Sequence, residues 1–257
     1  MLMFSKPFEQ TLTCGLITFN AEKYLRECLQ SIAFADEIII VDSGSTDKTL
    51  EIAKEFGASI TYSPMNRGFG AQKQLLLNRA RSHWFLLVDS DEVLTEELAA
   101  EIYVHTKRPQ YEGMWIRRVS YCCGRKMQFG EWRNDWVLRL VRTAGSFFTA
   151  DMVHERLCYE GSCIRAKHVM HHYTYSTPIE IIEKQLSYAK LASHQKHPQK
   201  RTNIAVACFA SLYRFLYSYI LKLGFLDGYP GFFYCVARAH GVFWKYVFHM
   251  SNANRSD

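Results

Sequence analysis

A short apolar stretch followed by three carboxylates is the part of this sequence best suited to chemistry. Residues 84–88 read Trp-Phe-Leu-Leu-Val, and Asp89-Ser90-Asp91-Glu92 come directly after them. A short apolar run bounded by polar residues is typical of a strand buried on both faces. Side chains two apart in an extended segment point the same way, so Asp89 and Asp91 are predicted to converge on one cation. Open α/β sheets bind ligands at the carboxyl edge, where this strand would end.

Oxygen ligands indicate which cation would bind here. Carboxylates favour Mg²⁺ or Mn²⁺, and two protein ligands leave coordination positions for the phosphate oxygens of a substrate. One hypothesis is therefore a metal ion held against a diphosphate. The alternative is a solvated turn that caps the following helix, and for an isolated Asp-x-Asp this alternative is favoured. The residues upstream of the motif favour the metal site over the turn.

Strands and helices alternate in the first 107 residues, which predicts a mostly parallel sheet with right-handed crossovers. Asp42 ends the second strand, at the edge where ligands bind. Lys73 lies on a predicted helix and either approaches a ligand or occupies a solvated face, while Asp47 is also a possible helix N-cap. The predicted strands are 11–19, 37–41, 59–62 and 84–88, and the predicted helices are 21–32, 48–56, a helix carrying Lys73, and 95–106.

Four segments occur in the order seen in family 2 inverting glycosyltransferases of the GT-A fold, which the chain resembles. They are Phe19-Asn20-Ala21-Glu22, the segment from Val41 to Asp47, Asn66-Arg67-Gly68, and Asp89-Ser90-Asp91-Glu92. Four motifs in register are far more specific than any one of them. The chain departs from the usual Asn-Glu-Glu at Asn20-Ala21-Glu22, and it has Lys73 where arginine is common. The resemblance implies an α/β, Rossmann-like, mostly parallel mixed sheet.

The resemblance also implies roles for five residues. Asp42 would hold the uracil or ribose of a UDP-sugar, and Asp47 would support the same loop. Lys73 would approach the nucleotide or its phosphates. Asp91 would be the firmer ligand of the Mg²⁺ or Mn²⁺ ion, and Asp89 would contact the ribose or the metal.

An acceptor hydroxyl that displaces a diphosphate needs a base on its own side of the sugar. The segment Val-His-Glu that ends at Glu155 is similar to one in lipopolysaccharide-core transferases, so Glu155 is the candidate base and Asp151 the reserve. The alternative for Glu155 is an exposed acid paired with Arg156 or Arg139. The His-Tyr-x-Tyr pattern favours His172 as a further metal ligand by the same resemblance.

The middle of the chain predicts two more strands, at 113–121 and 135–142, with a basic and aromatic loop between them. That loop either contacts a phosphorylated sugar acceptor or is a basic surface loop.

The C-terminal third is helical by its pattern and rich in aromatic residues. A helix from Pro178 to about 194 is followed, from 204 to 250, by two helices that divide near 224–228. No uninterrupted run reaches the ~20 apolar residues of a spanning helix. Aromatic faces with basic residues suit an anionic membrane interface. The alternatives are an oligomer interface or a cap on the catalytic domain. Residues 222–228 resemble the tail of lipopolysaccharide-core β-1,4-glucosyltransferases of the WaaE/KdtX-like type.

Composition excludes several other classes of protein. The chain has 257 residues, 48% of them hydrophobic, and a net charge of +6 that suits an anionic partner. No nucleic-acid-binding module is visible, and no Gly-x-Gly-x-x-Gly follows the first strand, which argues against a dehydrogenase. The eight cysteines lack zinc-ligand spacing, and the first residues lack a signal-peptide pattern, so we expect a reducing cytoplasm.

These observations predict a GT-A catalytic domain at 1–177, with a nucleotide-sugar half to about 107 and an acceptor half from 108, and a helical region at 178–257. The resemblance implies transfer of glucose from UDP-glucose, with inversion, onto an inner-core heptose of a lipid-anchored glycan. The enzyme would be peripheral on the cytoplasmic face of the inner membrane. The alternatives are another lipid-linked or polysaccharide acceptor, or a non-catalytic protein that binds a nucleotide sugar or glycan.

Overall fold

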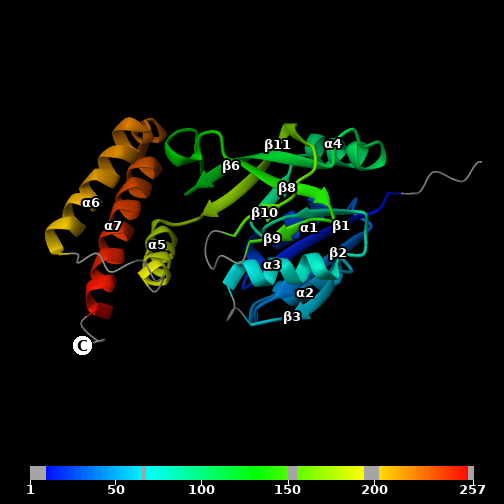
Figure 1. Cartoon of the computed structure of the whole chain (residues 1–257), viewed down its shortest axis with the longest axis horizontal. Coiled ribbons are helices and arrows are strands. Elements are labelled where there is room, and N and C mark those ends of the chain that lie inside the picture. Colours follow the sequence, from blue (N-terminus) through cyan, green and yellow to red (C-terminus); the bar gives the residue numbers. More distant parts are fainter. Residues whose placement is uncertain (1–9, 65–67, 150–154, 194–202, 254–257) are drawn as a thin grey trace, which may run out of the picture. The chain divides into compact units, whose positions relative to one another are not determined.

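The computed structural model describes residues 10–64, 68–149, 155–193 and 203–253 (Figure 1). The chain forms two compact units. Unit 1 comprises Met1–Arg118 and Trp136–His172, and unit 2 comprises Val119–Asp135 and Tyr173–Asp257. The segment from 119 to 135 therefore groups with the C-terminal helices, whereas the sequence placed it in the catalytic domain.

Unit 1 begins with the predicted alternation of strands and helices, and every predicted element of this half is present. Strand β1 pairs in parallel with β2 and with β4, and β2 pairs in parallel with β3. The α/β class is confirmed. The elements are β1 (Leu12–Thr18), α1 (Glu22–Ser31), β2 (Glu37–Asp42), α2 (Thr49–Glu55), β3 (Ser59–Tyr62), α3 (Gly68–Arg79), β4 (Trp84–Leu87) and α4 (Glu96–Lys107).

The remaining strands make the sheet mixed, because they pair in the antiparallel sense. Strand β8 (Trp136–Arg142) pairs with β4 and with β6 (Gly113–Cys122), and β11 (Cys163–Tyr175) pairs with β5 (Glu92–Leu94). The sheet order is β3-β2-β1-β4-β8-β6-β11-β5, so only the first half is parallel. Short strands complete the set: β7 (Arg125–Lys126) on β6, and β9 (Phe147–Phe148) paired with β10 (Leu157–Cys158).

Strand β4 is buried on both faces, as its sequence predicts. Trp84 and Leu86 belong to a cluster that includes Leu25 of α1. The alternate residue Phe85 belongs to a second cluster with Leu76 of α3. Each face of the strand is therefore covered by a different helix, and the chain after Leu87 emerges at a fixed position from the middle of the sheet.

Unit 2 contains the predicted division of the C-terminal region into two helices. Helix α7 (Gly228–Ala253) packs against both α5 (Pro178–Ser193) and α6 (Ile204–Leu216), as Figure 1 shows. Between α6 and α7 lie a π-helical turn, η3 (Tyr217–Leu221), and a 3₁₀ turn, η4 (Gly224–Asp227). A short 3₁₀ turn, η2 (Gly130–Trp132), belongs to the same unit.

A carboxylate in η2 ties the helices of unit 2 together. Glu131 pairs with Arg214 of α6 and with Arg238 of α7, whose Nε lies 3.1 Å from Oε2. The Tyr234 hydroxyl donates to the same carboxylate at 3.1 Å. One acid therefore joins two helices to the η2 turn.

The segment 222–228 has a structural role within unit 2. Asp227 accepts the backbone N–H groups of Gln128 at 2.9 Å and Phe129 at 3.0 Å, and the Gly130 N–H donates to the Lys222 carbonyl at 2.8 Å. A left-handed residue, Leu223 with φ of 60°, lets the chain turn sharply there. These bonds hold the loop before η2 against the connection between α6 and α7.

Candidate active site

The loop after β2 is organised by Asp42. Its carboxylate accepts the Thr18 hydroxyl at 2.7 Å, the Gly44 N–H at 2.8 Å, and both the N–H and the hydroxyl of Ser45 at 2.9 and 2.6 Å. Burial favours a raised pKa for Asp42, but these hydrogen bonds outweigh it and lower the pKa below its ordinary value. A carboxylate offers about four acceptor positions, so a nucleotide would have to replace one of these bonds. The nucleotide role of Asp42 stays a prediction.

Asp47 supports the same loop from its other end. One oxygen accepts the Thr49 N–H at 3.0 Å, at the start of α2, and the other accepts the Glu22 N–H at 3.1 Å, at the start of α1. Glu22 in turn accepts the Lys48 N–H at 3.0 Å, and Asn20 accepts the Thr46 N–H at 2.9 Å. The segments around Asn20 and Asp47 are therefore hydrogen-bonded to each other. The Asp47 carboxylate accepts backbone N–H groups at the first residues of α1 and α2.

The segment after β4 is a turn, and the expectation of an extended Asp89-to-Asp91 stretch is wrong. The Glu92 N–H donates to the Asp89 carbonyl at 2.9 Å, while the Glu92 carboxylate accepts the Asp89 N–H at 2.9 Å. This reciprocal pair closes the turn because both groups would otherwise lose hydrogen bonds on burial. Asp89 and Asp91 consequently have different partners.

Cations surround Asp89. The Arg139 guanidinium of β8 lies 2.5 Å from Oδ2, and the Lys73 ammonium of α3 lies 3.2 Å from Oδ1. Arg139 also contacts the buried Glu92, which Arg118 approaches at 3.2 Å. Burial alone raises the pKa of Asp89, but Arg139 and Lys73 hold that pKa well below its usual range. Asp89 is therefore ionised, and both of its oxygens already carry a cation, so a metal ion would share this carboxylate with Arg139 and Lys73.

Lys73 connects this cluster to the candidate base. Its side chain is 9% exposed, so the solvated-face alternative is wrong, and its ammonium lies 2.9 Å from Glu155. Burial lowers the pKa of Lys73, but the carboxylates of Asp89 and Glu155 raise it above its ordinary value. Glu155 is 11% exposed, and its ion pair is with Lys73. The alternative of an exposed Glu155 paired with Arg156 or Arg139 is wrong.

Asp91 meets His172. The Asp91 Oδ2 and His172 Nε2 atoms are 3.5 Å apart, because β11 pairs with β5 so that His172 lies opposite Glu92. An oxygen donor from this turn and a nitrogen donor from β11 suit Mg²⁺ or, more readily, Mn²⁺. Within residues 10–64, 68–149, 155–193 and 203–253, no group of three or more His, Cys, Asp or Glu residues could hold a metal ion. The reserve base, Asp151, lies outside the described residues.

Comparisons with known proteins place the chain in a family. The family model described as "Glycosyl transferase family 2" matches residues 13–150, just over half of the chain. The chain belongs to glycosyl transferase family 2. It is a transferase, as the sequence predicted, and the matched region contains Asp42, Lys73, Asp89 and Asp91.

Several relatives match most of the chain. A "Lipopolysaccharide core biosynthesis glycosyltransferase LpsC" of Rhizobium meliloti is 28% identical over 254 residues, which cover 92% of this chain and 93% of that protein. An uncharacterized glycosyltransferase of Rickettsia typhi is 25% identical over 232 residues, covering 84% of this chain and 79% of that protein. Among solved structures, S. aureus TarS 1–349 is 16% identical, covers 95% of this chain and 92% of that chain, and has a TM-score of 0.48.

Arg139 and Arg118 pair with the acidic motif in this family 2 site. The sequence analysis did not predict either arginine as a partner of that motif. Arg139 stands alone among apolar residues in Val137-Leu138-Arg139-Leu140-Val141 of a strand. A buried arginine needs a carboxylate partner, so this interruption was a usable signal. The interruption does not indicate which carboxylate is the partner, because Asp89 lies 50 positions away in the sequence.

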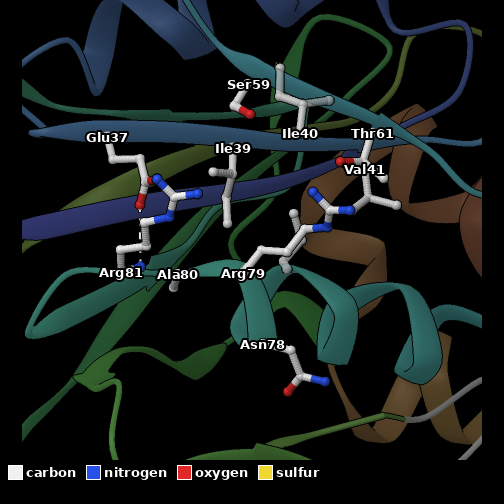
Figure 2. A pocket seen from close by; sticks show the side chains of 11 residues that line it. Glu37, Ile39, Ile40, Val41, Ser59, Thr61, Asn78, Arg79, Ala80 and Arg81 are labelled. Atoms are coloured by element: carbon white, nitrogen blue, oxygen red, sulfur yellow. Dashed lines mark hydrogen bonds between the residues drawn. The ribbon is translucent and has the colours of Figure 1, made fainter.

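A cavity of about 480 Å³ lies elsewhere in the glycosyltransferase unit (Figure 2). It is lined by Glu37 and Ser59, which begin β2 and β3, by Arg79 at the end of α3, and by Arg81 just after that helix. Figure 2 shows Arg81 beside Glu37, and the Arg81 N–H donates to that carboxylate at 3.3 Å. None of the charged residues around Asp89 lines this cavity, so the candidate chemistry is not there.

Proposed function

We propose that the chain is an inverting, metal-dependent hexosyltransferase that uses a UDP-sugar, with UDP-glucose as the first candidate. One observation carries this proposal: Lys73 joins Asp89 and Glu155 at the carboxyl edge of the sheet, beside the Asp91–His172 pair. Unit 1 alone thus provides the candidate base Glu155, the cation Lys73 for a phosphate, and the Asp91–His172 pair for a metal ion.

The residues divide the reaction between them. The acceptor hydroxyl attacks the anomeric carbon, the bond from that carbon to the diphosphate oxygen breaks, and Glu155 takes the hydroxyl proton. Asp91 and His172 would hold a divalent ion, which supplies charge neutralisation for the leaving diphosphate. Lys73 adds a second positive charge at the same edge. The diphosphate would compete with Glu155 for Lys73, and Glu155 would then be available to accept a proton.

The acceptor that we propose is an inner-core heptose of lipopolysaccharide or lipooligosaccharide. LpsC, which is named for lipopolysaccharide core biosynthesis and is similar over 92% of this chain, supports this choice. Such an acceptor is lipid-anchored, so we place the enzyme peripherally on the cytoplasmic face of the inner membrane, with no nucleic-acid partner. The competing functions are transfer to another lipid-linked or polysaccharide acceptor, and non-catalytic binding of a nucleotide sugar or glycan.

Calorimetric titration of UDP-glucose and UDP-galactose, each with Mn²⁺ and with a chelator, tests the donor site. We expect one donor to bind, and its affinity to fall when the metal is chelated. Asp91→Ala should lose the metal-dependent part of the affinity, because the variant keeps only His172 of the pair. Failure of both donors to bind, or unchanged metal dependence in Asp91→Ala, would contradict this assignment.

Glu155→Gln tests the transfer step. The variant should bind the donor and lose about 10²- to 10⁴-fold in transfer, the range attributed to general-base catalysis. Glu160→Gln is the matched control, because Glu160 is an exposed acid five positions along the chain. If Glu155→Gln keeps its transfer activity, Glu155 is not the base, and Asp151 is the next candidate. Donor binding without turnover in the unaltered chain would support the non-catalytic alternative.

A further inference from the structure

The outer surface of α6 and η3 is apolar over an unusual length. The 18 residues Ile204–Leu221 have a mean hydropathy of 1.6, and only 11% of this stretch is buried. Within the described part of the chain, it is the one helical stretch long and apolar enough to cross a membrane. Soluble monomers rarely expose a large contiguous apolar patch, so this surface requires an occupant.

The side chains on this face are well exposed. Phe209 is 73% exposed, Leu221 is 70% and Tyr213 is 65%. Ile204, Leu212 and Ile220 are each at least half exposed along the same stretch, and η4 adds Phe225 and Leu226. The exposed residues between 204 and 221 include no charged and no amide side chain.

The one charged residue within the stretch is turned inward, while Lys222 just beyond it is exposed. Arg214 is the one charged residue between 204 and 221, and it pairs with Glu131 inside unit 2, as does Arg238 of α7. The Lys222 ammonium, just beyond the stretch, lies over the Tyr217 ring at 5.5 Å from its centroid. The sequence suggested aromatic residues and bases together on an anionic interface, whereas the two arginines neutralise a carboxylate of their own unit.

We infer that the outer face of α6, η3 and η4 is buried in the acyl region of a lipid bilayer, with α6 lying in the membrane plane. Attachment is then driven by burial of apolar surface and depends little on anionic headgroups. This inference concerns unit 2 alone and adds a mode of attachment to the proposed location.

The other helices of unit 2 favour the in-plane orientation over a spanning one. Helix α6 packs on α7, and α7 packs on α5. Lys245 of α7 and Glu183 and Lys190 of α5 are exposed. If α6 crossed the bilayer, charged residues of its companions would be drawn into hydrocarbon, which costs several kcal/mol each.

The composition of the face favours lipid over a second protein. Protein interfaces carry a polar rim and about one hydrogen bond per 100–200 Å². The exposed residues from Ile204 to Leu221 offer little beyond the Tyr213 hydroxyl and the Cys208 thiol for such bonds. Lipid tails need no hydrogen-bonding partner.

Flotation of the full chain with neutral phosphatidylcholine vesicles tests the inference. We expect the chain to float with these vesicles, with little change between about 0.05 and 0.5 M salt, a range that strongly screens surface charge. Phe209→Glu and Leu221→Glu should each weaken partition about 10- to 100-fold, since each removes one inserted apolar side chain. Val104→Glu is the matched control and should float unchanged, because Val104 is 63% exposed on α4 of unit 1.

Three results would overturn the inference. Binding that needs phosphatidylglycerol and disappears in salt would make the attachment electrostatic. Flotation of Phe209→Glu and Leu221→Glu equal to that of the unaltered chain would exclude this face. Absence of flotation, with an oligomer in light scattering that Phe209→Glu dissociates, would assign the face to a second copy. Urea denaturation without vesicles checks that the variants are folded. This check does not depend on donor binding, so a failure of the donor assignment stays separate from a failure of this one.

Discussion

Both units pair arginines with carboxylates, but only one of these clusters has the surroundings of a site. In unit 1, Arg139 joins Asp89 to Glu92 where β4 ends. In unit 2, Glu131 joins Arg214 to Arg238 between helices. The first cluster lies at the carboxyl edge of parallel strands, and Lys73 extends it to Glu155. In the second cluster Glu131 also accepts a hydrogen bond from the Tyr234 hydroxyl, and these contacts join helices.

An ion pair between an arginine and a carboxylate is therefore not by itself evidence of function. Such pairs give little net stability and appear wherever charge must be buried. What marks the first cluster is its neighbour, the Asp91–His172 pair, whose donors suit a metal ion. The second cluster is distinguished by where its arginines point. Arg214 turns towards Glu131 inside unit 2, and the outer face of α6 is left apolar. Arg139→Met and Glu131→Gln separate these roles, and Ser45→Ala tests the loop that Asp42 organises.

Arg139→Met should have the largest effect. It leaves Asp89 with Lys73 and Glu92 with Arg118, so two buried carboxylates each lose a cation. We expect a loss of about 3 kcal/mol in the free energy of unfolding, at the lower end for a broken buried pair. Metal-dependent donor binding should weaken as well, because the turn that carries Asp91 is closed by Asp89 and Glu92.

Urea denaturation and donor titration of Arg139→Met measure the two effects. Arg117→Met is the matched control, since Arg117 is an exposed arginine and its replacement should change stability by less than about 0.5 kcal/mol. Equal stability of Arg139→Met and the unaltered chain would show that the cluster does not hold this turn.

The parts of this comparison differ in how far the sequence predicts them. Strand β4 and its flanking helices follow from an apolar run and helical spacing, which are local properties. The turn from 89 to 92 was predicted only as the alternative to an extended segment, and the three-residue strand β5 was missed, because acids directly after a strand do not reveal which way the chain bends. Asp91 and His172 were both predicted as metal ligands, and the structure brings them together.

The partners of the charged residues were the least predictable part. Lys73 and Glu155 are 82 positions apart, and Arg139 and Asp89 are 50 apart. Sequence spacing carries no information about such contacts, because they depend on which strands become neighbours in the sheet. The position of β8 beside β4 decides the second of them. The Glu131 cluster was missed for the same reason.

Glu131→Gln should have a smaller effect, confined to unit 2. The amide leaves Arg214 and Arg238 without a carboxylate partner, and we expect a loss of about 1–3 kcal/mol in stability. Donor affinity should not change, since every candidate site residue belongs to unit 1. Glu183→Gln, an exposed acid of α5, is the control. A loss of donor affinity in folded Glu131→Gln would remove the distinction between the two clusters.

The smallest change in stability is expected in the loop around Asp42, where it depends on pH. Its folded pKa is depressed, so its ionised form stabilises the fold above the unfolded pKa of about 3.9 and that contribution is lost as pH falls through the folded pKa. Ser45→Ala removes one hydrogen bond to this carboxylate. The stability gap between the unaltered chain and Ser45→Ala should be about 1 kcal/mol above roughly pH 5 and should narrow as Asp42 protonates.

Ser43→Ala provides the control for this pH effect. The Ser43 hydroxyl is buried, and within the described residues no hydrogen-bond partner is found for it. Its replacement should therefore shift stability by the same amount at every pH, as urea denaturation from about pH 7 to pH 3 would measure. If the Ser45→Ala gap is equally constant, hydrogen bonding does not depress the pKa of Asp42. The Ser45 hydroxyl would then not contribute to stabilising the ionised form of Asp42.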